Sequence, residues 1–393
     1  MSSEFHRASA DVVVVGAGVV GAACAFYAAR AGLRVTVVDA GAVAGGTTGA
    51  GEGNLLVSDK EPGPELELAL RSTALWRELT PELGPDADIE YEPKGGVVVA
   101  ESPQGYDALL AFAATQRAAG VVAEAVTDKD LASLEPHLAP GLPGGVLYPQ
   151  DSQVQPMLAA AWLLRAAQRS GATVHPHTRV TGIDRTPDGR VTGVRTSRGT
   201  VTAGAVVNAA GTWSAGVAAL AGVELPIMPR RGFILVTEPL PVLVRHKVYG
   251  AEYVANVASS SADLETSAVV EGTASGTILI GASRERVGFD RTLSLRVLQR
   301  LADQAIRLFP VLADVSAIRT YRGFRPYAPD HLPVIGADPR APGLFHACGH
   351  EGAGVGLAPV TGVLTAALLT GTDPGLDLRP FRPDRFESTA VSA

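Results

Sequence analysis

The sequence predicts an α/β protein in which a dinucleotide-binding domain carries a second, α+β domain built on a mainly antiparallel sheet. The first observation is a strand, turn, helix and strand pattern over residues 11–39. The second is a change of pattern after residue 89, where short strands separated by turn residues take over. A chain of 393 residues is long enough for two domains. We expect residues 1–80, 151–222 and 326–393 to form the dinucleotide-binding domain and residues 81–150 and 223–325 to form the second domain.

The N-terminal pattern begins with a buried strand and a glycine-rich turn. Residues 12–15 are valines without a charge among them, as a strand buried on both faces requires. Glycines follow at once in GxGxxG spacing, at Gly16, Gly18 and Gly21. The first permits the tight turn, the second lets the backbone approach a pyrophosphate, and the third lets the next helix pack closely on the strand. This spacing predicts a Rossmann-like dinucleotide site.

A helix and a second strand complete this unit. Residues 21–30 are expected to be helical, and residues 35–38 to form a strand that ends in Asp39. A carboxylate there can accept hydrogen bonds from a ribose and would repel a 2′-phosphate, while the phosphates would lie at the helix N-terminus. A transmembrane span or a signal peptide would also explain the uncharged run 12–29, but the glycines and the immediate second strand argue against both.

The net charge and the cysteine content indicate which binding partners and which cellular compartment to expect. The net charge is −7, from 33 basic and 40 acidic residues, and the basic residues form no long run. Nucleic acid and anionic membranes are therefore not expected partners, and we expect no transmembrane segment. The only cysteines, Cys24 and Cys348, are far apart in sequence, which excludes a CxxC motif and a disulfide framework and fits a reducing, cytoplasmic setting.

Two further segments have the composition of a backbone packed against a flat ligand. The loop after Asp39 is glycine-rich and polar, and its polar residues are Thr47, Thr48, Glu52 and Asn54. An ordinary flexible connection is the alternative interpretation of this loop. Residues 206–211, VVNAAG, are expected to form a buried strand that ends in small residues, which again suits close approach to a cofactor.

The C-terminal part of the chain holds a candidate for the reacting end of the cofactor. Residues 349–356 form a glycine-rich loop directly before a predicted helix, 358–369, so a helix N-terminus can face an electron-rich group. A reduced flavin carries negative charge near N1, and such a dipole would favour its formation. The overlapping HxCxHE stretch, with His346, Cys348 and His350, could instead hold a soft metal, but no fourth ligand is recognisable and we predict no metal.

One arginine is the candidate for substrate binding. The guanidinium of Arg325 can hold a carboxylate through two parallel hydrogen bonds and so fix an α-carbon over a cofactor. A surface or domain-bridging salt bridge is the alternative. Tyr253, Glu52 and His350 are ambiguous when each is considered alone. Hydrolase and phosphate-loop chemistry have no support, because the sequence contains neither GxSxG nor GxxxxGKS/T.

Several separated stretches together resemble one family. They are VVVVGAGVVGAACAFYAARAGLRVTVVD, GGTTGAGEGN, VVNAAGTWS, RRGFILVTE, GTILIGASRE, FRPYAPDHLPVIG and CGHEGAGVGLAPVTG, and they span nearly the whole chain in order. The chain is similar to the FAD-dependent amino acid and amine oxidoreductases of the D-amino acid oxidase group, which includes glycine oxidase and sarcosine oxidase. Within that group, GAGEGNLLVSDKEPGPEL and CGHEGAGVGLAP most resemble the flavin-bearing β subunits of bacterial D-hydroxyproline and proline dehydrogenase, opine oxidase and hydrogen cyanide synthase.

The resemblance implies a domain of the glutathione-reductase type with a defined FAD-lining set. The residues expected along the cofactor are Gly16, Gly18, Val19, Val20, Gly21, Asp39, Ala40, Thr47, Thr48, Glu52, Gly53, Asn54, Ala210 and Gly211, with Val180 near the adenine. Those expected around the isoalloxazine are Gly349, His350, Glu351, Gly352, Ala353, Gly354, Val355 and Gly356.

The resemblance also implies roles at the substrate. Arg325 falls on the family's carboxylate-binding arginine in an RPxxxD pattern, and Tyr253 falls near its substrate-contacting tyrosine; with His350 they are the expected catalytic residues. Glycine oxidase has a substrate-contacting arginine where this chain has Gly352, so the substrate contacts must differ there. The stretch FRPYAPDHLP has no cysteine where monomeric sarcosine oxidases attach their flavin, which predicts non-covalent FAD.

The expected reaction is FAD-dependent oxidation of the Cα–N bond of a small amino acid, with a cyclic or N-substituted one favoured. It would give an imine that hydrolyses later. Electrons would pass to a partner subunit that carries iron and sulfur or another flavin, or to another acceptor. A free-standing oxidase that makes hydrogen peroxide, a non-catalytic FAD-carrying subunit and, more weakly, an NAD-only enzyme are the alternatives.

Overall fold

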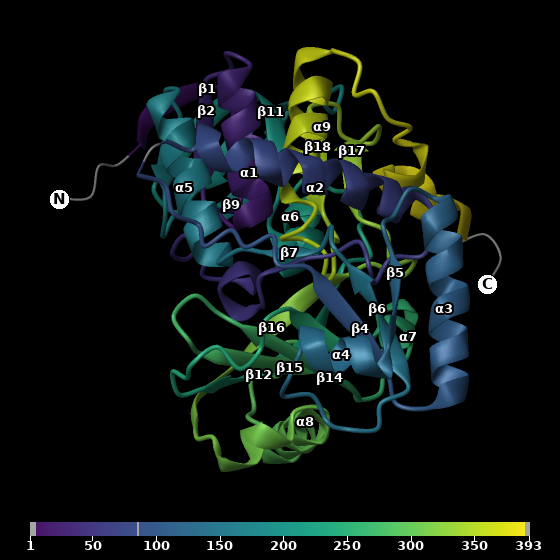
Figure 1. The fold of residues 1–393 in the computed structure, drawn as a ribbon. Helices are drawn as coiled ribbons and strands as arrows, with labels where there is room; N and C mark the ends of the chain where they lie inside the picture. Colours follow the sequence, from purple (N-terminus) through teal and green to yellow (C-terminus); the bar gives the residue numbers. More distant parts are fainter. Residues whose placement is uncertain (1–4, 85, 390–393) are drawn as a thin grey trace.

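The computed structural model describes residues 5–84 and 86–389, and it has two layers, each built on an eight-stranded sheet (Figure 1). The first sheet has the strand order β17-β18-β11-β1-β2-β8. Its strands are β1 (Phe5–Val15), β2 (Val35–Val38), β8 (Thr173–His175), β11 (Gly199–Asn208), β17 (Val334–Ala337) and β18 (Leu344–Cys348), with β9 (Val180–Arg185) and β10 (Val191–Thr196) attached beside β11. Along the main order only β17 is antiparallel to its neighbour.

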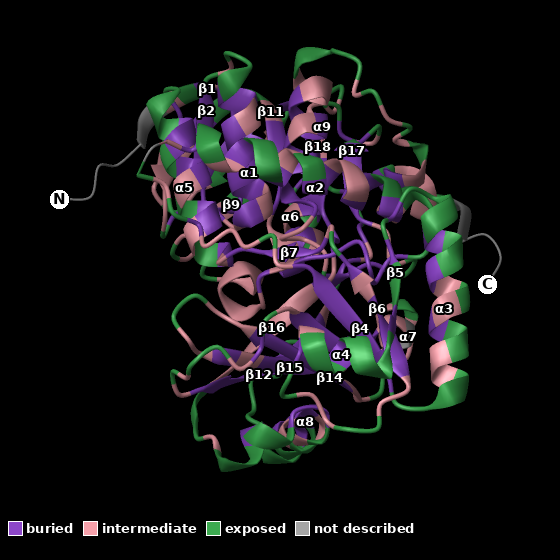
Figure 2. Ribbon diagram, in the orientation of Figure 1, coloured by how far each residue is buried: buried purple, intermediate pink, exposed green. Residues whose placement is uncertain are grey.

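Helices cover this sheet, and small residues let them approach it. They are α1 (Val19–Arg30), α2 (Pro64–Glu82), α5 (Pro156–Arg169), α6 (Ser214–Ala219) and α9 (Ala358–Thr370). A Cβ added at Gly21 would lie 2.0 Å from the Gly16 carbonyl oxygen, and one added at Gly362 on α9 would lie 2.7 Å from the Ala23 carbonyl oxygen on α1. Because both faces of the sheet are covered, its central strands are buried (Figure 2).

The second sheet has the strand order β16-β12-β15-β14-β13-β4-β6-β5. Its strands are β4 (Gly96–Ala100), β5 (Glu124–Thr127), β6 (Gly144–Tyr148), β12 (Met228–Thr237), β13 (Lys247–Gly250), β14 (Glu265–Gly272), β15 (Ile278–Arg284) and β16 (Ala317–Tyr327). Every neighbouring pair is antiparallel except β13 with β4. The helices of this layer are α3 (Pro103–Ala118), α4 (Asp128–Leu134), α7 (Glu252–Ala258) and α8 (Leu295–Leu308).

Short elements complete the fold. The strands β3 (Asn54–Leu55) and β7 (Ser152–Gln153) pair in a small antiparallel sheet of their own. The 3-10 turns are η1 (Thr47–Ala50), η2 (Gly211–Trp213), η3 (Pro310–Asp314), η4 (Arg379–Phe381) and η5 (Pro383–Thr389). Within the described part of the chain, no helix is both long enough and apolar enough to cross a membrane.

The predicted fold class is confirmed, whereas the domain boundaries stay a prediction. Residues 248–257 have the pattern of a strand in the sequence, but the prediction of a strand throughout is wrong. The strand stops with β13, and Tyr253 lies on α7, because Glu252 favours the helix N-terminus and alanines favour the helix. Residues 141–150, which are rich in turn residues, also contain β6. A Cβ at Gly145 would lie 2.4 Å from the Val98 carbonyl oxygen, so close strand pairing requires the glycine there.

Candidate active site

The glycine-rich turn leaves bare backbone at the N-terminus of α1. Gly16 has φ +117°, and a Cβ there would lie 2.3 Å from the Ala209 carbonyl oxygen. Gly18 is the N-cap residue and has no side chain to cover the helix end. The Val19 N–H donates to the Thr48 hydroxyl at 3.0 Å. The first turn of α1 therefore offers N–H groups and the positive end of the helix dipole to an anionic group.

Asp39, directly after β2, is held by the same turn. Its carboxylate accepts hydrogen bonds from the N–H groups of Ala17 and Gly41, both at 2.7 Å. A carboxylate has about four lone-pair sites, so about two remain for ribose hydroxyls. The Asp39 carbonyl accepts from the Thr178 N–H at 2.6 Å, which places the chain leading to Val180 and β9 beside it. Ala40 is exposed at this point.

Thr47 and Thr212 connect the first layer to β16. The hydroxyl of each donates to the Phe324 carbonyl at 2.7 Å. Ala210 and Gly211 lead into Thr212, and a Cβ at Gly211 would lie 3.8 Å from the Thr47 hydroxyl. The carbonyl immediately before Arg325 is thus tied to two segments that the sequence assigns to the cofactor.

Glu52 is a buried carboxyl with one unpaired oxygen. Its Oε2 accepts from the Asn54 amide at 3.1 Å, while Oε1 has no hydrogen-bond partner among the described residues. Burial raises the pKa of Glu52, although Lys247, 4.0 Å away, opposes this rise. Lys247 lies 2.6 Å from Glu271 and donates to Asn54. Glu52 Oε1 is therefore a buried acceptor that a ligand can satisfy.

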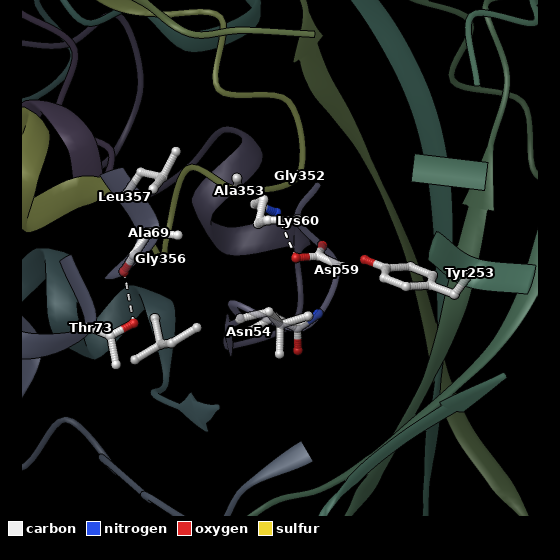
Figure 3. Close-up of a pocket in the computed structure, with 12 residues that line it drawn as sticks. Asn54, Asp59, Lys60, Ala69, Thr73, Tyr253, Gly352, Ala353, Gly356 and Leu357 are labelled. Carbon is white, nitrogen blue, oxygen red and sulfur yellow. Dashed lines mark hydrogen bonds and ion pairs between the residues drawn. The ribbon is translucent and has the colours of Figure 1, made fainter. Parts of the chain in front are cut away.

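Residues 349–356 follow β18, and Gly352, Ala353 and Gly356 of this loop line a pocket that opens to solvent (Figure 3). The pocket is lined by Asn54, Leu55, Leu56, Asp59, Lys60, Ala69, Thr73, Tyr253, Gly352, Ala353, Gly356 and Leu357. The loop is anchored to α2, because the Gly356 carbonyl accepts from the Ser72 hydroxyl at 2.6 Å and from the Trp76 indole at 3.1 Å. A Cβ at Gly354 would lie 3.9 Å from Val20 Cγ2, so the loop passes beside the start of α1.

His350 is a buried, neutral residue. Its Nε2 lies 3.0 Å from the Thr361 hydroxyl, and that hydroxyl donates its hydrogen to the Leu357 carbonyl at 2.8 Å. Nε2 must therefore carry the hydrogen of the imidazole. Burial lowers the pKa of His350 to about 3. The imidazole is accordingly uncharged near neutral pH.

The Glu351 side chain is turned toward the second sheet. Arg230 donates to its Oε1 at 2.6 Å, and His331 Nδ1 lies 3.1 Å from its Oε2. Although burial opposes ionisation, the His331 and Arg230 contacts lower the pKa of Glu351 to about 2. Glu351 is thus an ionised member of a buried network, and its backbone N–H is fixed by the Pro326 carbonyl at 3.1 Å.

Arg325 lies on β16 and is partly buried. Its Nη1 donates to the Ser283 carbonyl at 2.8 Å, and this is the only hydrogen bond that its side chain makes with the described residues. Desolvation and the positive charge of Arg284 lower the pKa of Arg325. The remaining N–H groups of the guanidinium are available to a ligand.

Tyr253 and the ion pair of Asp59 with Lys60 also line the pocket. Tyr253 is 7% exposed, and Figure 3 shows its ring directed toward Asp59. Asp59 Oδ1 lies 2.7 Å from Lys60 Nζ. Burial raises the pKa of Tyr253, so its hydroxyl stays protonated near neutral pH. This wall can therefore donate a hydrogen bond to a bound molecule.

Comparison with known proteins assigns the family. A family model described as FAD dependent oxidoreductase matches residues 11–368. The chain belongs to this family. It is 31% identical to a glycine oxidase of Geobacillus kaustophilus over 94% of this chain and 96% of that protein, and 30% identical to the hydrogen cyanide synthase subunit HcnC of Pseudomonas aeruginosa over 96% of both. The crystal structure of glycine oxidase from Geobacillus kaustophilus has a TM-score of 0.88 to this chain at 30% identity, over 96% of this chain and 99% of that one.

Family membership confirms the predicted group, and the protein is an FAD-dependent oxidoreductase. The described residues fit that cofactor. The bare N-terminus of α1 would hold the pyrophosphate, Asp39 the ribose, and the unpaired Glu52 oxygen a hydrogen-bond donor of the cofactor. The individual contacts of the expected FAD-lining residues stay predictions.

The side chains of the HxCxHE stretch, residues 346–351, interact with other protein residues. His346 Nδ1 lies 3.2 Å from the Asn208 amide, and its Nε2 lies 3.0 Å from Asp338. Cys348 is buried, and burial raises the pKa of its thiol to about 12. In residues 5–84 and 86–389, no group of three or more histidine, cysteine, aspartate or glutamate side chains is placed to hold a metal.

Sequence reasoning missed several residues of the site. Lys247, Glu271 and Arg284 are buried beside residues that were predicted. Only a charged residue within an apolar strand, such as Lys247 at the start of β13 or Arg284 at the end of β15, could have indicated them.

Proposed function

We propose that the protein oxidises the Cα–N bond of a small amino acid whose carboxylate binds Arg325. The observation that carries this proposal is the Arg325 guanidinium, which has a single hydrogen bond to the described residues. A guanidinium with unused, coplanar donors suits a carboxylate, which it can bind through two parallel hydrogen bonds. The likeness to a glycine oxidase supports an amino acid as the substrate.

The surrounding residues have supporting roles in this proposal. Tyr253 shapes the pocket and offers a hydroxyl, and His350 is a neutral part of the cofactor wall. Bound FAD supplies the acceptor for two electrons. The substrate loses a hydride equivalent from Cα and a proton from nitrogen, so that the Cα–N bond becomes an imine, which water then hydrolyses. An amine that binds neutral needs no general base, and we assign none.

The proposal also includes an acceptor for the electrons of the reduced flavin. The likeness to HcnC, which is a subunit, supports transfer to a partner subunit, for which iron and sulfur or a second flavin would be the carrier. Hydrogen peroxide formation by the isolated chain would favour the free-standing oxidase instead. Non-covalent FAD and a cytoplasmic location belong to the same proposal. Acid precipitation should release the flavin into the supernatant if it is not covalently attached.

Anaerobic substrate screening tests the proposal. The holoenzyme is mixed with D- and L-proline, hydroxyprolines, glycine, sarcosine, octopine and iminodiacetate, and the flavin absorbance is followed. Bleaching by at least one of them is expected. If none bleaches the flavin in the purified chain or in its complex, the chain is a non-catalytic subunit and the proposal fails.

Substitution of Arg325 tests the site itself. Arg325→Ala should weaken substrate binding by roughly 2–5 kcal/mol, because the carboxylate loses a partly buried charged partner. Exposed Arg319 on the same strand provides the control, and Arg319→Ala should leave binding unchanged. Unchanged affinity in Arg325→Ala would remove Arg325 from the substrate site.

A further inference from the structure

A second arginine lies beside the two residues given substrate roles above. Arg284 is at the end of β15 and is 4% exposed. Its guanidinium carbon lies 5.0 Å from the centre of the Tyr253 ring. The hydrogen bond from Arg325 ends on the carbonyl of Ser283, the residue before Arg284. Two positive side chains therefore meet next to the pocket wall that Tyr253 forms.

Arg284 forms no ion pair in the described part of the protein, although its charge helps to lower the pKa of Glu351. Its Nη1 is buried without any hydrogen-bond partner there, and it takes part in none of the ion pairs. The neighbouring carboxylates are already used, because Arg230 lies 3.0 Å from Glu265 and 2.6 Å from Glu351. Glu351 is thus shared between Arg230 and Arg284, and it leaves the buried Arg284 Nη1 without a hydrogen-bond acceptor. An anionic group of a ligand could supply both the acceptor and a further negative charge.

We propose that the substrate has two acidic groups, and that Arg284 binds the second while Arg325 binds the α-carboxylate. The substrate class is an amino acid with a further carboxylate on its side chain or on its nitrogen substituent. This inference rests on the proposed function. An apolar substituent at the same place would leave the Arg284 donor unpaired, and an amide would pair the donor without adding a counter-charge, so the site favours a carboxylate over both.

The competing explanation is a structural one. Arg284 could serve only to pack against the Tyr253 ring, in which case the second acidic group would gain nothing. The two explanations differ in what they predict for substrates that match in shape and differ in charge.

Matched pairs of substrates distinguish the two explanations in the wild-type holoenzyme. The pairs are iminodiacetate with its monoamide and glutamate with glutamine, the latter as both enantiomers. The measured quantity is the anaerobic rate of flavin reduction divided by the substrate dissociation constant. We expect at least one dicarboxylate to exceed its neutral counterpart by about 10-fold or more. Equal values within both pairs, or preference for the neutral member, overturn the inference.

Variants then assign the preference to Arg284. Arg284→Met should lower the ratio of the dicarboxylate value to the neutral value by about 10-fold or more. Arg284→Lys keeps the charge and should retain part of the preference. Arg319, an exposed arginine 5.7 Å from the Tyr321 ring, is the matched control, and Arg319→Met should change neither value. An equal loss for both substrates in Arg284→Met would support the structural explanation and overturn ours.

Binding without turnover gives a readout that is independent of catalysis. Calorimetric titration of the holoenzyme with glutarate and with butyrate should show tighter binding of the diacid in the wild type and loss of that difference in Arg284→Met. If no amine reduces the flavin, the proposed function fails. If neutral amino acids reduce the flavin as efficiently as dicarboxylates do, and glutarate and butyrate bind with equal affinity, only the present inference fails.

Discussion

The guanidinium of Arg325 extends across β12 to the carbonyl oxygen of Ser283 on β15, 2.8 Å away. Gly232 on β12 leaves the space for it, since a Cβ there would lie 2.3 Å from Arg325 Nη1 and 2.6 Å from that carbonyl oxygen. The position of the proposed carboxylate-binding group thus depends on the absence of one methyl group from the intervening strand.

Gly232→Ala should displace the Arg325 side chain and weaken substrate binding by about 10-fold or more, which is about 1.4 kcal/mol. FAD binding should be little affected. The measurement is the substrate dissociation constant from anaerobic flavin titration. Gly216→Ala is the control, because a Cβ at Gly216 meets nothing within 4 Å. Wild-type affinity in Gly232→Ala would show that Arg325 does not need this space.

Asp39→Ala should weaken FAD binding. The substitution leaves the N–H groups of Ala17 and Gly41 without their acceptor and removes the proposed ribose contact, for a combined cost of roughly 1–3 kcal/mol. Fluorescence titration of the apoprotein with FAD gives the dissociation constant. Asp107→Ala, at an exposed position on α3, is the control. Equal FAD affinity in the Asp39 variant and the control would contradict the role of Asp39.

His350 should make the protein less stable as the pH falls. Its pKa is about 3 in the folded protein and 6.5 ordinarily, so the unfolded chain binds the proton first. The stabilisation is complete above pH 6.5 and is lost as the pH falls toward 3. At pH 5.5 the loss relative to pH 7.5 should be about 1.4 kcal/mol, and it should vanish in His350→Gln.

Urea unfolding at these two pH values measures this effect, with exposed His137→Gln as the control. The control should keep the wild-type pH dependence. An identical pH dependence in His350→Gln and the wild type would show that His350 is not held neutral by the fold.

Glu351→Gln should destabilise the folded protein by about 3–5 kcal/mol, because it removes one counter-charge from the buried Arg230. Since the pKa of Glu351 is about 2 rather than 4.5, the stabilisation from its ionised form is present above pH 4.5 and is lost as the pH falls toward 2. Chemical unfolding near pH 7 provides the measurement. Glu387→Gln, in an exposed pair with Arg340, should cost about 0–1 kcal/mol. A loss as small as that of the control would contradict a buried network.

The dinucleotide unit was predictable because its signals are local. A run of valines specifies a buried strand, the glycines of residues 16–21 permit a turn that other residues cannot make, and Asp39 follows the next strand directly. Each of these depends on neighbours within a few residues. The expectation of FAD came from motifs with a constant order along the chain, and family membership confirms it.

The charged residues next to the pocket were not predictable in the same way. Strand propensity alone misplaced Tyr253, which lies on α7 after β13 ends. Lys247 and Glu271 meet through the pairing of β13 with β14. Arg284 and Arg325 come near one another because their strands, β15 and β16, both pair with β12. Sequence periodicity indicates which residues share a face of a strand, but not which strands become neighbours or in which register.

The sequence by itself determined the nucleotide-binding turn, the fold class and the cofactor, because local backbone geometry and ordered motifs specify them. Only the tertiary structure decided that Arg284 and Arg325 converge next to Tyr253 without a carboxylate to pair with Arg284. Long-range packing of separate strands and a helix sets that arrangement of charge, and no single stretch of sequence encodes it.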